Sequence, residues 1–352
     1  MSLKVAVWGT GGVGSWAIHG IARRGDLDLI GVWVHSPEKV GVDAGTLAGI
    51  EPIGLAATDD IDAILALRPD CIVYTASGPM LDAGAIPDYE RFLRAGIDVV
   101  TVTSPALVYP PGYPERSRQR LEEAAAAGGA TLYASGIEPG FAADQFPLTM
   151  LTMSSSIRSV RVQELFTYDT YPVEFTMREV FGFGKPMDHS PIMASTGAQL
   201  MTWGPVVQLV AAGLGVELDE IRETWFQRAT DRDLDTAFGP VESGTIGAVR
   251  FETIGVVDGR DAIVVEHINR LKMDLAPDWP TADRDGTYRV IIEGEPSLQC
   301  ELTVGSETDF YESGMLATAM RIVNAVPFVV AADPGLVSSL DLPLTTPRHA
   351  FD

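Results

Sequence analysis

Short apolar runs alternate with helical segments over roughly the first 145 residues of the chain. Apolar residues recur at helical spacing in 80–96 and 115–127, and the second segment ends at a glycine pair. Strands that alternate with helices form a doubly wound parallel sheet. The predicted strands are Val5–Trp8, Leu29–Val34, Cys71–Thr75, Val99–Thr103 and Thr131–Ala134.

After about residue 150 the pattern changes to longer stretches in which apolar and polar residues alternate. Such alternation predicts strands with one buried face, in a mostly antiparallel sheet. Helical segments are predicted at 190–214 and 312–325, and the second is expected to return the chain to the first domain. The predicted strands are Val160–Tyr168, Ala248–Val257, Ala262–Lys272, Tyr288–Glu293 and Leu298–Val304.

A glycine-rich turn, Gly9-Thr10-Gly11-Gly12-Val13-Gly14, lies between the first predicted strand and an apolar helical pattern. Its spacing is G-x-G-x-x-G. Gly9 permits a tight turn, Gly11 lets the backbone approach a pyrophosphate, and Gly14 lets the helix lie close to the strand. The diphosphate would then lie at the helix N-terminus, among unpaired N–H groups. The motif predicts a bound dinucleotide, held by the six residues from Gly9 to Gly14.

These patterns predict an α/β protein with a Rossmann-type doubly wound domain and a second, α+β domain. We expect the dinucleotide-binding domain over 1–147, the substrate domain over 148–307, and a C-terminal segment, 308–352, that returns to the first domain. A nucleotide domain interrupted by a sheet domain places the active site in the cleft between them, over the carboxyl ends of the parallel strands.

The turn after the second predicted strand, His35-Ser36-Pro37-Glu38-Lys39, lacks the acid that usually accepts the ribose 2′-hydroxyl of NAD at the strand end. Ser36 can donate to a 2′-phosphate and Lys39 supplies positive charge, so the turn favours NADP(H), with His35 included in the predicted site. In the alternative, Ser36 caps the next helix and Lys39 is a solvated charge. Glu38 can also reach the ribose, so NAD(H) stays open.

Three loops at strand ends are expected to project toward the nicotinamide: Ala76-Ser77-Gly78-Pro79, Ser104-Pro105-Ala106-Leu107 and Gly136–Phe141. From the first two, Ala76, Ser77 and Ser104 are predicted to contact the cofactor. The third carries Glu138, and a carboxylate in a partly apolar cleft can act as a general base or bind a cationic nitrogen. A turn-forming surface glutamate is the alternative reading of Glu138.

In the second domain, the stretch Phe181–His189 combines glycines, aromatic residues, a cation, an acid and an imidazole. His189 or Lys185 could donate to a substrate carbonyl or imine, although a glycine-permitted turn with packed aromatic residues fits the same stretch. Tyr168 is a candidate pocket wall or proton donor, with core packing as the alternative. His267 fits a sheet residue better than a catalyst. The candidate catalytic set is Glu138, His189 and Tyr168.

Composition narrows the class of protein. The net charge of −23 argues against nucleic acid as a partner. No apolar stretch approaches the roughly 20 residues that a membrane helix needs, and no signal-peptide pattern opens the chain, so we expect a cytoplasmic protein. Cys71 and Cys300 are expected to be ordinary buried thiols. The five scattered histidines form no recognised metal motif.

Several segments together resemble the dihydrodipicolinate-reductase-like oxidoreductases related to 2,4-diaminopentanoate dehydrogenase and the native amine dehydrogenases. The resemblance implies an NADP- or NAD-linked enzyme, a homodimer through its sheet domain, that interconverts an amine with a ketone and ammonia. It also adds Asn324 to the predicted cofactor-binding residues. The matching segments are Val7–Gly11, Ser36–Gly41, Asp70–Thr75, Gly136–Phe141, Gly182–Gly184, Ala317–Met320 and Asn324–Pro327.

The chain departs from this family pattern at one position. Amine dehydrogenases resemble one another in carrying a glutamate in the loop after the fifth strand, where this chain has Ala106. Relatives often have asparagine in place of Glu138, so we hypothesise that the carboxylate has moved to that neighbouring strand end. The substrate is then a small amine, imine or ketone. A carbonyl or alcohol oxidoreductase without ammonia, and an inactive NADP(H)-binding sensor, are the alternatives.

Overall fold

The computed structural model describes residues 2–76, 81–305 and 310–348 and divides into two compact units. The first comprises Met1–Phe141 and Met315–Asp352, and the second Ala142–Gly314. The sequence patterns had suggested boundaries after residues 147 and 307. The second boundary of the structure, between Gly314 and Met315, falls inside the long helix α8, Phe310–Val329.

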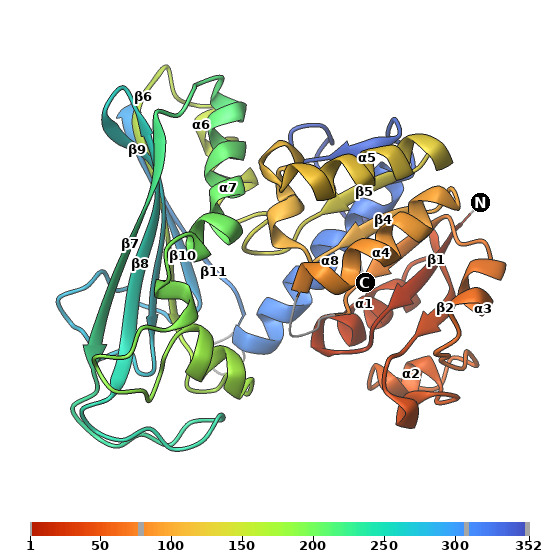
Figure 1. Ribbon diagram of the computed structural model, residues 1–352, viewed down its shortest axis with the longest axis horizontal. Coiled ribbons are helices and arrows are strands. Elements are labelled where there is room, and N and C mark those ends of the chain that lie inside the picture. The colour runs from red at the N-terminus through yellow and green to blue at the C-terminus, as the bar shows by residue number, and fades with distance from the viewer. Residues whose placement is uncertain (1, 77–80, 306–309, 349–352) are drawn as a thin grey trace. The chain divides into compact units, whose positions relative to one another are not determined.

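A six-stranded sheet in the order β12-β5-β4-β3-β1-β2 forms the first unit, and each of its pairings is parallel (Figure 1). Its strands are β1 Leu3–Trp8, β2 Leu27–Trp33, β3 Cys71–Tyr74, β4 Asp98–Thr101, β5 Thr131–Ala134 and β12 Gly335–Val337. Its helices are α1 Gly12–Ala22, α2 Ala44–Leu47, α3 Ile61–Ala66, α4 Leu81–Arg94, α5 Glu115–Gly128 and α8 Phe310–Val329, with short 3-10 turns η1 Pro37–Lys39, η2 Pro105–Val108 and η3 Pro110–Gly112. The predicted doubly wound fold is confirmed.

Two apolar layers cover the two faces of this sheet. On one face, side chains such as Trp8 pack against Phe92 of α4 and Leu121 of α5. On the other face, Val7 packs with Ile18 of α1 and with the α8 residues around Ile322. Because successive strand residues point to opposite faces, both layers are supplied by the same continuous apolar runs. The layers fix where the carboxyl ends of the strands lie, and the glycine turn follows one of those ends.

The second unit contains a mixed six-stranded sheet in the order β11-β10-β6-β9-β8-β7. Only its central pairing, β6 with β9, is parallel, so the prediction of a mostly antiparallel sheet is confirmed. Its strands are β6 Ser156–Thr167, β7 Glu220–Ala229, β8 Ile246–Val257, β9 Arg260–Arg270, β10 Thr287–Glu295 and β11 Leu298–Thr303. Its helices are α6 Gln145–Leu151 and α7 Ala198–Leu214, with short helical turns η4 Thr176–Val180 and η5 Ile192–Ala194.

Some elements differ from the sequence prediction. Strand β7 was not predicted, because its charged and polar residues dilute the alternation and none of its residues is fully buried. Strand β12 is only three residues long and pairs with β5 alone. The predicted helix over 190–214 begins later, at Ala198, after the turn η5. Cys71 is buried as expected, whereas Cys300 is half-exposed, and both thiols are free.

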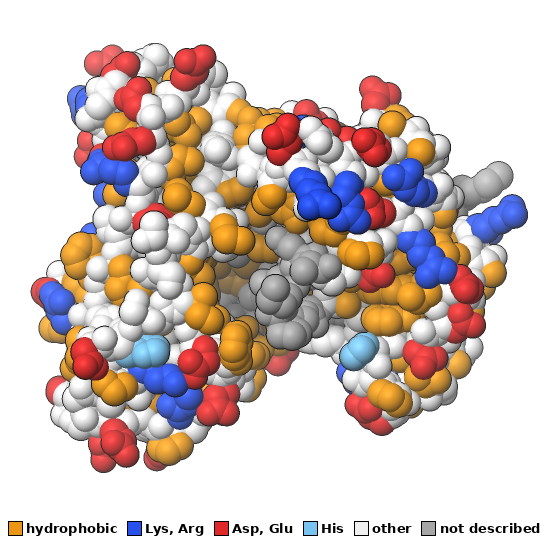
Figure 2. Space-filling model, viewed as in Figure 1, with side chains coloured by type: hydrophobic (Ala, Val, Ile, Leu, Met, Phe, Trp, Pro, Cys, Tyr) orange, Lys and Arg blue, Asp and Glu red, His pale blue; other side chains and the backbone are white. Residues whose placement is uncertain are grey.

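Charged side chains of both signs are mixed on the surface formed by α4 and α5 (Figure 2). Arg120 pairs with Glu90 at 2.7 Å and Arg118 with Glu122 at 2.7 Å. Acids thus accompany the arginines of this face instead of leaving a continuous basic stripe. Within the described residues, no helix combines the length and the apolar character needed to span a membrane.

Candidate active site

The glycine turn of the first unit is closed by backbone contacts that only glycine permits. Gly9 has a φ of 101°, and a Cβ placed on it would lie 2.8 Å from the Cα of Ala76, which follows β3. A Cβ on Gly14 would lie 2.1 Å from the carbonyl oxygen of Gly9. The Thr75 hydroxyl donates to that same oxygen at 3.0 Å. The turn is therefore pressed between the start of α1 and the end of β3.

Gly11 has a different environment from these two glycines. It is the N-cap of α1 with an ordinary φ of −75°, and a Cβ on it would meet no atom within 4 Å. The space beside Gly11 is therefore open, while the first amides of α1 lie next to it. An anion placed there would receive hydrogen bonds from the helix N-terminus, the arrangement that holds a pyrophosphate in Rossmann-type domains.

Lys39 reaches from the turn after β2 back to the glycine loop. Its Nζ donates to the carbonyl oxygen of Thr10 at 3.1 Å and to the Thr10 hydroxyl at 3.2 Å. Ser36 is the N-cap of η1, but its side chain makes no capping hydrogen bond, contrary to the alternative reading of this residue. His35 is exposed and lies 6.2 Å, ring centre to ring centre, from Trp33. A cation and a hydroxyl thus lie in one turn beside the loop.

Two of the residues predicted to bind the cofactor have other partners. The hydroxyl of Ser104 is buried and lies 3.2 Å from that of Tyr89, so this side chain faces the core under α4. Asn324 accepts a hydrogen bond of 2.8 Å from Arg24, which follows the last turn of α1. The glycine loop is at the opposite end of that helix, roughly 16 Å away at 1.5 Å per residue. These contacts direct the Ser104 hydroxyl into the core and the Asn324 amide to Arg24, and cofactor binding by either residue stays a prediction.

The other predicted loop residues differ in what the structure shows. Ala76 lies against Gly9, and its carbonyl oxygen accepts a hydrogen bond of 2.8 Å from Thr103. Ala76 thus belongs to the wall of the glycine turn. Ser77 lies outside the described residues. Ala106, the position where the family pattern has an acid, is buried in η2 with 6% of its surface exposed.

The loop Gly136–Phe141 carries Glu138 and follows β5. Arg321 of α8 fixes this loop: its guanidinium donates to the carbonyl oxygen of Gly140 at 3.1 Å and lies 5.1 Å from the centre of the Phe141 ring. The Ser135 hydroxyl also donates to the Gly140 carbonyl oxygen, at 3.0 Å. Glu138 is half-buried. The carboxylate therefore sits on a loop whose backbone is held from two sides.

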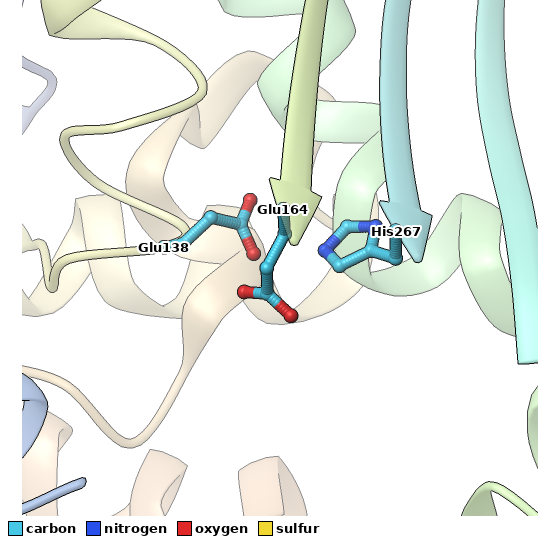
Figure 3. Close-up of side chains that lie close together, drawn as sticks. All are labelled: Glu138, Glu164 and His267. Carbon is cyan, nitrogen blue, oxygen red and sulfur yellow. The ribbon is translucent and has the colours of Figure 1, made fainter. Parts of the chain in front are cut away.

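In the second unit, an acid and an imidazole face each other across the one parallel strand pair. Glu164 of β6 is in register with His267 of β9, and both lie toward the carboxyl ends of their strands (Figure 3). The His267 ring extends toward Glu164, and a ring nitrogen of His267 lies within 4.8 Å of a carboxylate oxygen of Glu164. Glu164 is 7% exposed and His267 2%. A carboxylate and an imidazole so placed can exchange a proton with each other or with a bound ligand.

Tyr168, which comes just after β6, completes this group. Its hydroxyl donates to Oε1 of Glu164 at 2.9 Å. Burial, followed by the negative charge of Glu164, raises the pKa of Tyr168 well above its usual range. The phenol therefore stays protonated at neutral pH and acts as a hydrogen-bond donor to the carboxylate. We call Glu164, His267 and Tyr168 the acid–imidazole group.

His189, the third predicted catalytic residue, lies elsewhere in the second unit. Its backbone oxygen accepts a hydrogen bond of 3.4 Å from Gln227 of β7, and the neighbouring Lys185 pairs with Glu179 at 2.7 Å. Among the described residues, the carboxylate oxygens and ring nitrogens that gather around Glu164 and His267 do not include those of His189. The structure thus places Tyr168 beside Glu164, whereas His189 acts electrostatically on a different acid, Glu179.

Sequence reasoning missed Glu164, and it read His267 as an ordinary sheet residue. One signal was present in the sequence. Glu164 is spaced two residues apart from its neighbours in the series Val160, Val162 and Phe166, so it lies with them on the apolar face of the strand. An acid on the buried side of an alternating pattern needs a partner. The sequence does not show which strand supplies that partner, because the pairing of β6 with β9 is set by the fold.

Comparison with known proteins places the chain in a family. The family model of the 2,4-diaminopentanoate dehydrogenase C-terminal domain matches residues 154–350, more than half of the chain. An amine dehydrogenase from Streptomyces virginiae is 42% identical over 97% of this chain and 96% of its own length. The chain belongs to the family of amine and 2,4-diaminopentanoate dehydrogenases. It is an NAD(P)-dependent oxidoreductase, as the glycine loop and the resemblance predicted.

More distant relatives agree with this assignment. A 2,4-diaminopentanoate dehydrogenase from Acetoanaerobium sticklandii is 20% identical over 97% of this chain and 94% of its own length. The structure of an amine dehydrogenase from Mycobacterium smegmatis aligns with a TM-score of 0.79 at 21% identity, covering 100% of this chain and 99% of the other. At that identity the structural match speaks for the fold, which is shared along the whole chain.

Proposed function

We propose that this enzyme catalyses reductive amination of a small ketone or aldehyde with NAD(P)H and ammonia, and the reverse oxidation of the amine. The observation that carries the proposal is the 42% identity, over nearly the full length of both chains, to an amine dehydrogenase. Both kinds of group that the reaction requires are present: a backbone cradle for a dinucleotide at Gly9–Gly14, and buried acid–base side chains.

The chain's own residues divide the work in this proposal. The open space beside Gly11 and the first amides of α1 hold the pyrophosphate. When bound, the nicotinamide supplies or accepts the hydride, and the protein positions it and manages protons. Oxidation of an ammonium substrate requires a base to remove a proton from nitrogen, and reductive amination requires the same group to return one.

Glu138 is the acid that we propose for the first unit, as an acid–base or ammonium-binding group. The clamp of Arg321 and Ser135 on Gly140 holds its loop, so the carboxylate needs little reorganisation to act. Replacing Glu138 with Gln should abolish turnover while the affinity for NADPH stays within about twofold. Unchanged turnover would remove Glu138 from the reaction without affecting the assignment of the enzyme class.

The preferred cofactor in this proposal is NADP(H). The Nζ of Lys39, anchored on Thr10, and the uncapped hydroxyl of Ser36 offer a cation and a donor for a 2′-phosphate. Glu38 is exposed in the same turn and supports NAD(H) as the alternative, because a carboxylate there can accept from a ribose hydroxyl.

We further propose that the enzyme is a homodimer through the second sheet. Helices α6 and α7 lie along one face of this sheet, and no helix covers the other in Figure 1. On that other face, Arg161 and Arg250 both pair with Glu266, and Phe226 is 48% exposed. A charge on the face should weaken the contact, so Phe226→Glu is expected to halve the mass measured by light scattering. An unchanged mass would place the interface elsewhere.

A cytoplasmic location is part of the same proposal. Both cysteines are free, although Cys300 is half-exposed and accessible to oxidants. Free accessible thiols are typical of proteins in reducing compartments.

The central test is NADPH oxidation by the purified protein with a panel of small ketones and aldehydes, with and without high ammonium, and with NADH in parallel. Turnover that requires ammonium is the expected result. Turnover without ammonium would favour the second candidate, a carbonyl reductase, for which the loss of an acid at Ala106 and the protonated Tyr168 hydroxyl are the motivating observations. Cofactor binding without turnover on any substrate would favour a sensor.

A further inference from the structure

We propose that Glu164 is the acid–base residue that exchanges a proton with the substrate nitrogen, positioned by Tyr168 and His267. This inference rests on the proposed amine dehydrogenase function and divides the two roles named there: Glu164 exchanges the proton, and Glu138 binds the ammonium group. Glu164 then acts as the catalytic residue in the second unit, and Tyr168 and His267 act through it.

The position of Glu164 is fixed by the strand pair. β6 and β9 run parallel, so their carboxyl ends meet at one edge of the sheet, and Glu164 and His267 occupy matched positions there. Matched residues point to the same face. Neighbouring strands hold both backbones, because β6 also pairs with β10 and β9 with β8. A side chain on a central strand is held more rigidly than one on a loop, as acid–base catalysis requires.

Aromatic rings confine the imidazole beside Glu164. The His267 ring stacks on Phe251 at 4.5 Å with an angle of 5°, and the Trp203 ring of α7 lies 4.3 Å from it at a tilted angle. Tyr168 contacts Phe181 at 6.0 Å and Tyr171 at 5.8 Å. The carboxylate therefore lies among apolar rings that exclude water, where its interaction with a cationic substrate nitrogen is stronger than in solvent.

The other buried acid on these strands has different partners. Glu266 lies on the opposite face, with its side chain completely buried, and it accepts from the guanidinium groups of Arg161 and Arg250 at 2.6 and 2.7 Å. The two arginines and the Gln163 amide occupy both oxygens of this carboxylate, which gives it a structural role. Glu164 instead faces a phenol and an imidazole, and neither is a fixed cation. The contrast separates a structural carboxylate from one that can gain and lose a proton.

The chemistry balances with Glu164 as base. In the oxidative direction, the Glu164 carboxylate takes one proton from the substrate ammonium, R₂CH–NH₃⁺, leaving the neutral amine with its lone pair. Loss of hydride from the carbon converts this amine to the iminium R₂C=NH₂⁺. Water then adds to the iminium carbon, and the resulting carbinolamine breaks its C–N bond. The overall change is R₂CH–NH₃⁺ + NAD(P)⁺ + H₂O → R₂C=O + NAD(P)H + NH₄⁺ + H⁺.

Tyr168 and His267 act on the charge of Glu164. The hydrogen bond from the Tyr168 hydroxyl favours the ionised carboxylate, since the phenol donates to it. His267 places a second group within 4.8 Å that can share the proton after it leaves the nitrogen. Removing Tyr168's hydroxyl should therefore alter the pH at which Glu164 becomes a base without removing the base itself.

The experiment compares four variants of the full-length enzyme with the wild type. Glu164→Gln removes the base, Glu164→Asp keeps a carboxylate, and Tyr168→Phe removes the hydrogen bond. Glu301→Gln, a partly exposed acid of β11 that pairs with Arg289 at 2.7 Å, is the matched control. For each variant, kcat/KM for amine oxidation is measured from pH 4 to pH 10, together with the Kd for NADPH and the Tm.

Glu164→Gln is expected to lower kcat/KM by about 10²–10⁴-fold, with the Kd for NADPH unchanged. Glu164→Asp should recover part of this loss. Tyr168→Phe should move the acidic limb of the pH profile to higher pH, because the ionised carboxylate loses a donor. A merely structural role would lower the Tm of both Glu164 variants and leave the shape of the pH profile unchanged in Tyr168→Phe.

The outcomes separate the two proposals. If the wild type oxidises amines and Glu164→Gln retains its kcat/KM, this inference is overturned and the proposed function stands. If the wild type shows no activity that depends on amine or ammonium, the proposed function fails first. If Glu164→Gln does not fold, Tyr168→Phe decides: a shifted acidic limb supports Glu164 as the titrating group, and an unshifted limb overturns it.

Discussion

The two units build their functional groups from different materials. In the first unit, the glycine loop is made of backbone, and its shape depends on the absence of side chains at Gly9 and Gly14. In the second unit, the acid–imidazole group consists of side chains from separate strands, brought together by the register of β6 and β9. A cofactor common to many enzymes is held by groups that every residue has, whereas proton transfer to a particular substrate needs particular side chains.

The largest effect is expected from Gly14→Ala, which tests whether the loop is as tightly closed as its contacts indicate. The new methyl group would lie 2.1 Å from the backbone oxygen of Gly9, and a backbone atom cannot move aside without opening the turn. We expect a loss of about 1–3 kcal/mol in the free energy of unfolding, the range for overpacked sites, together with loss of cofactor binding. Chemical denaturation and NADPH titration measure the two. Retained stability would show that the turn is looser than these contacts indicate.

Gly11→Ala should separate cofactor binding from folding. The added Cβ meets no protein atom within 4 Å, and the φ of −75° suits any residue. The methyl group would instead occupy the space that a pyrophosphate needs. We expect the Kd for NADPH to rise at least about tenfold, equivalent to 1.4 kcal/mol, while the Tm without cofactor stays the same. An unchanged Kd would mean that the nucleotide does not approach the backbone here.

Lys39→Met tests the cation of the first unit that we assign to nucleotide choice. Methionine keeps most of the apolar stem but removes the charge beside Thr10. We expect the KM for NADPH to rise roughly tenfold and that for NADH to change less than about twofold, because only NADPH carries the ribose 2′-phosphate proposed to meet the lysine. Equal increases for both cofactors would show that Lys39 only holds the loop. Lys4→Met, at an exposed lysine near the start of β1, is the matched control.

Asp98→Asn offers a carboxylate of the first unit whose role we expect to be structural, for contrast with Glu164. Burial raises the pKa of Asp98 to about 6, further raised by Asp70 and opposed by the hydrogen bond from the Thr131 amide. A raised native pKa means that the folded state binds more protons, so stability falls as the pH rises from about 4 to about 6.

The Asp98→Asn variant should escape this loss, because asparagine carries no charge and its oxygen can still accept from Thr131. At pH 7 we expect it to be about 1–2 kcal/mol more stable than the wild type, after allowance for partial exposure, and to gain nothing at pH 4. Unfolding in urea at both pH values measures this. Its kcat should equal that of the wild type, and a changed kcat would contradict a purely structural role for Asp98.

The sequence located the glycine loop because its determinants are local. Its spacing, and the strand and helix on either side, lie within a few residues, and the conformation of Gly9 follows from that short stretch. The apolar runs likewise predicted the strands β1 to β5 of the first sheet, since strands that are mostly buried leave a clear apolar pattern. Strands β7 and β12 were missed because β7 has no fully buried residue and β12 is only three residues long, so neither leaves a clear apolar pattern.

The directions of the side chains could not be predicted from short stretches of sequence. Ser104 lies in a loop at a strand end, and Asn324 in a segment that matches the family pattern, yet one is directed into the core and the other at Arg24. Glu138 was found because it stands at a strand end between turn residues. Glu164 was not, because its significance depends on Tyr168 and His267, and His267 comes from a strand far along the chain.

The sequence by itself thus determined the α/β class and the glycine loop, because backbone geometry and hydrophobic period are encoded over short windows, and its resemblance to known dehydrogenases indicated the kind of enzyme. Only the tertiary structure decided which acid meets which partner. Strand order and register bring together residues that no spacing rule connects, and they alone placed His267 opposite Glu164 and two arginines against Glu266.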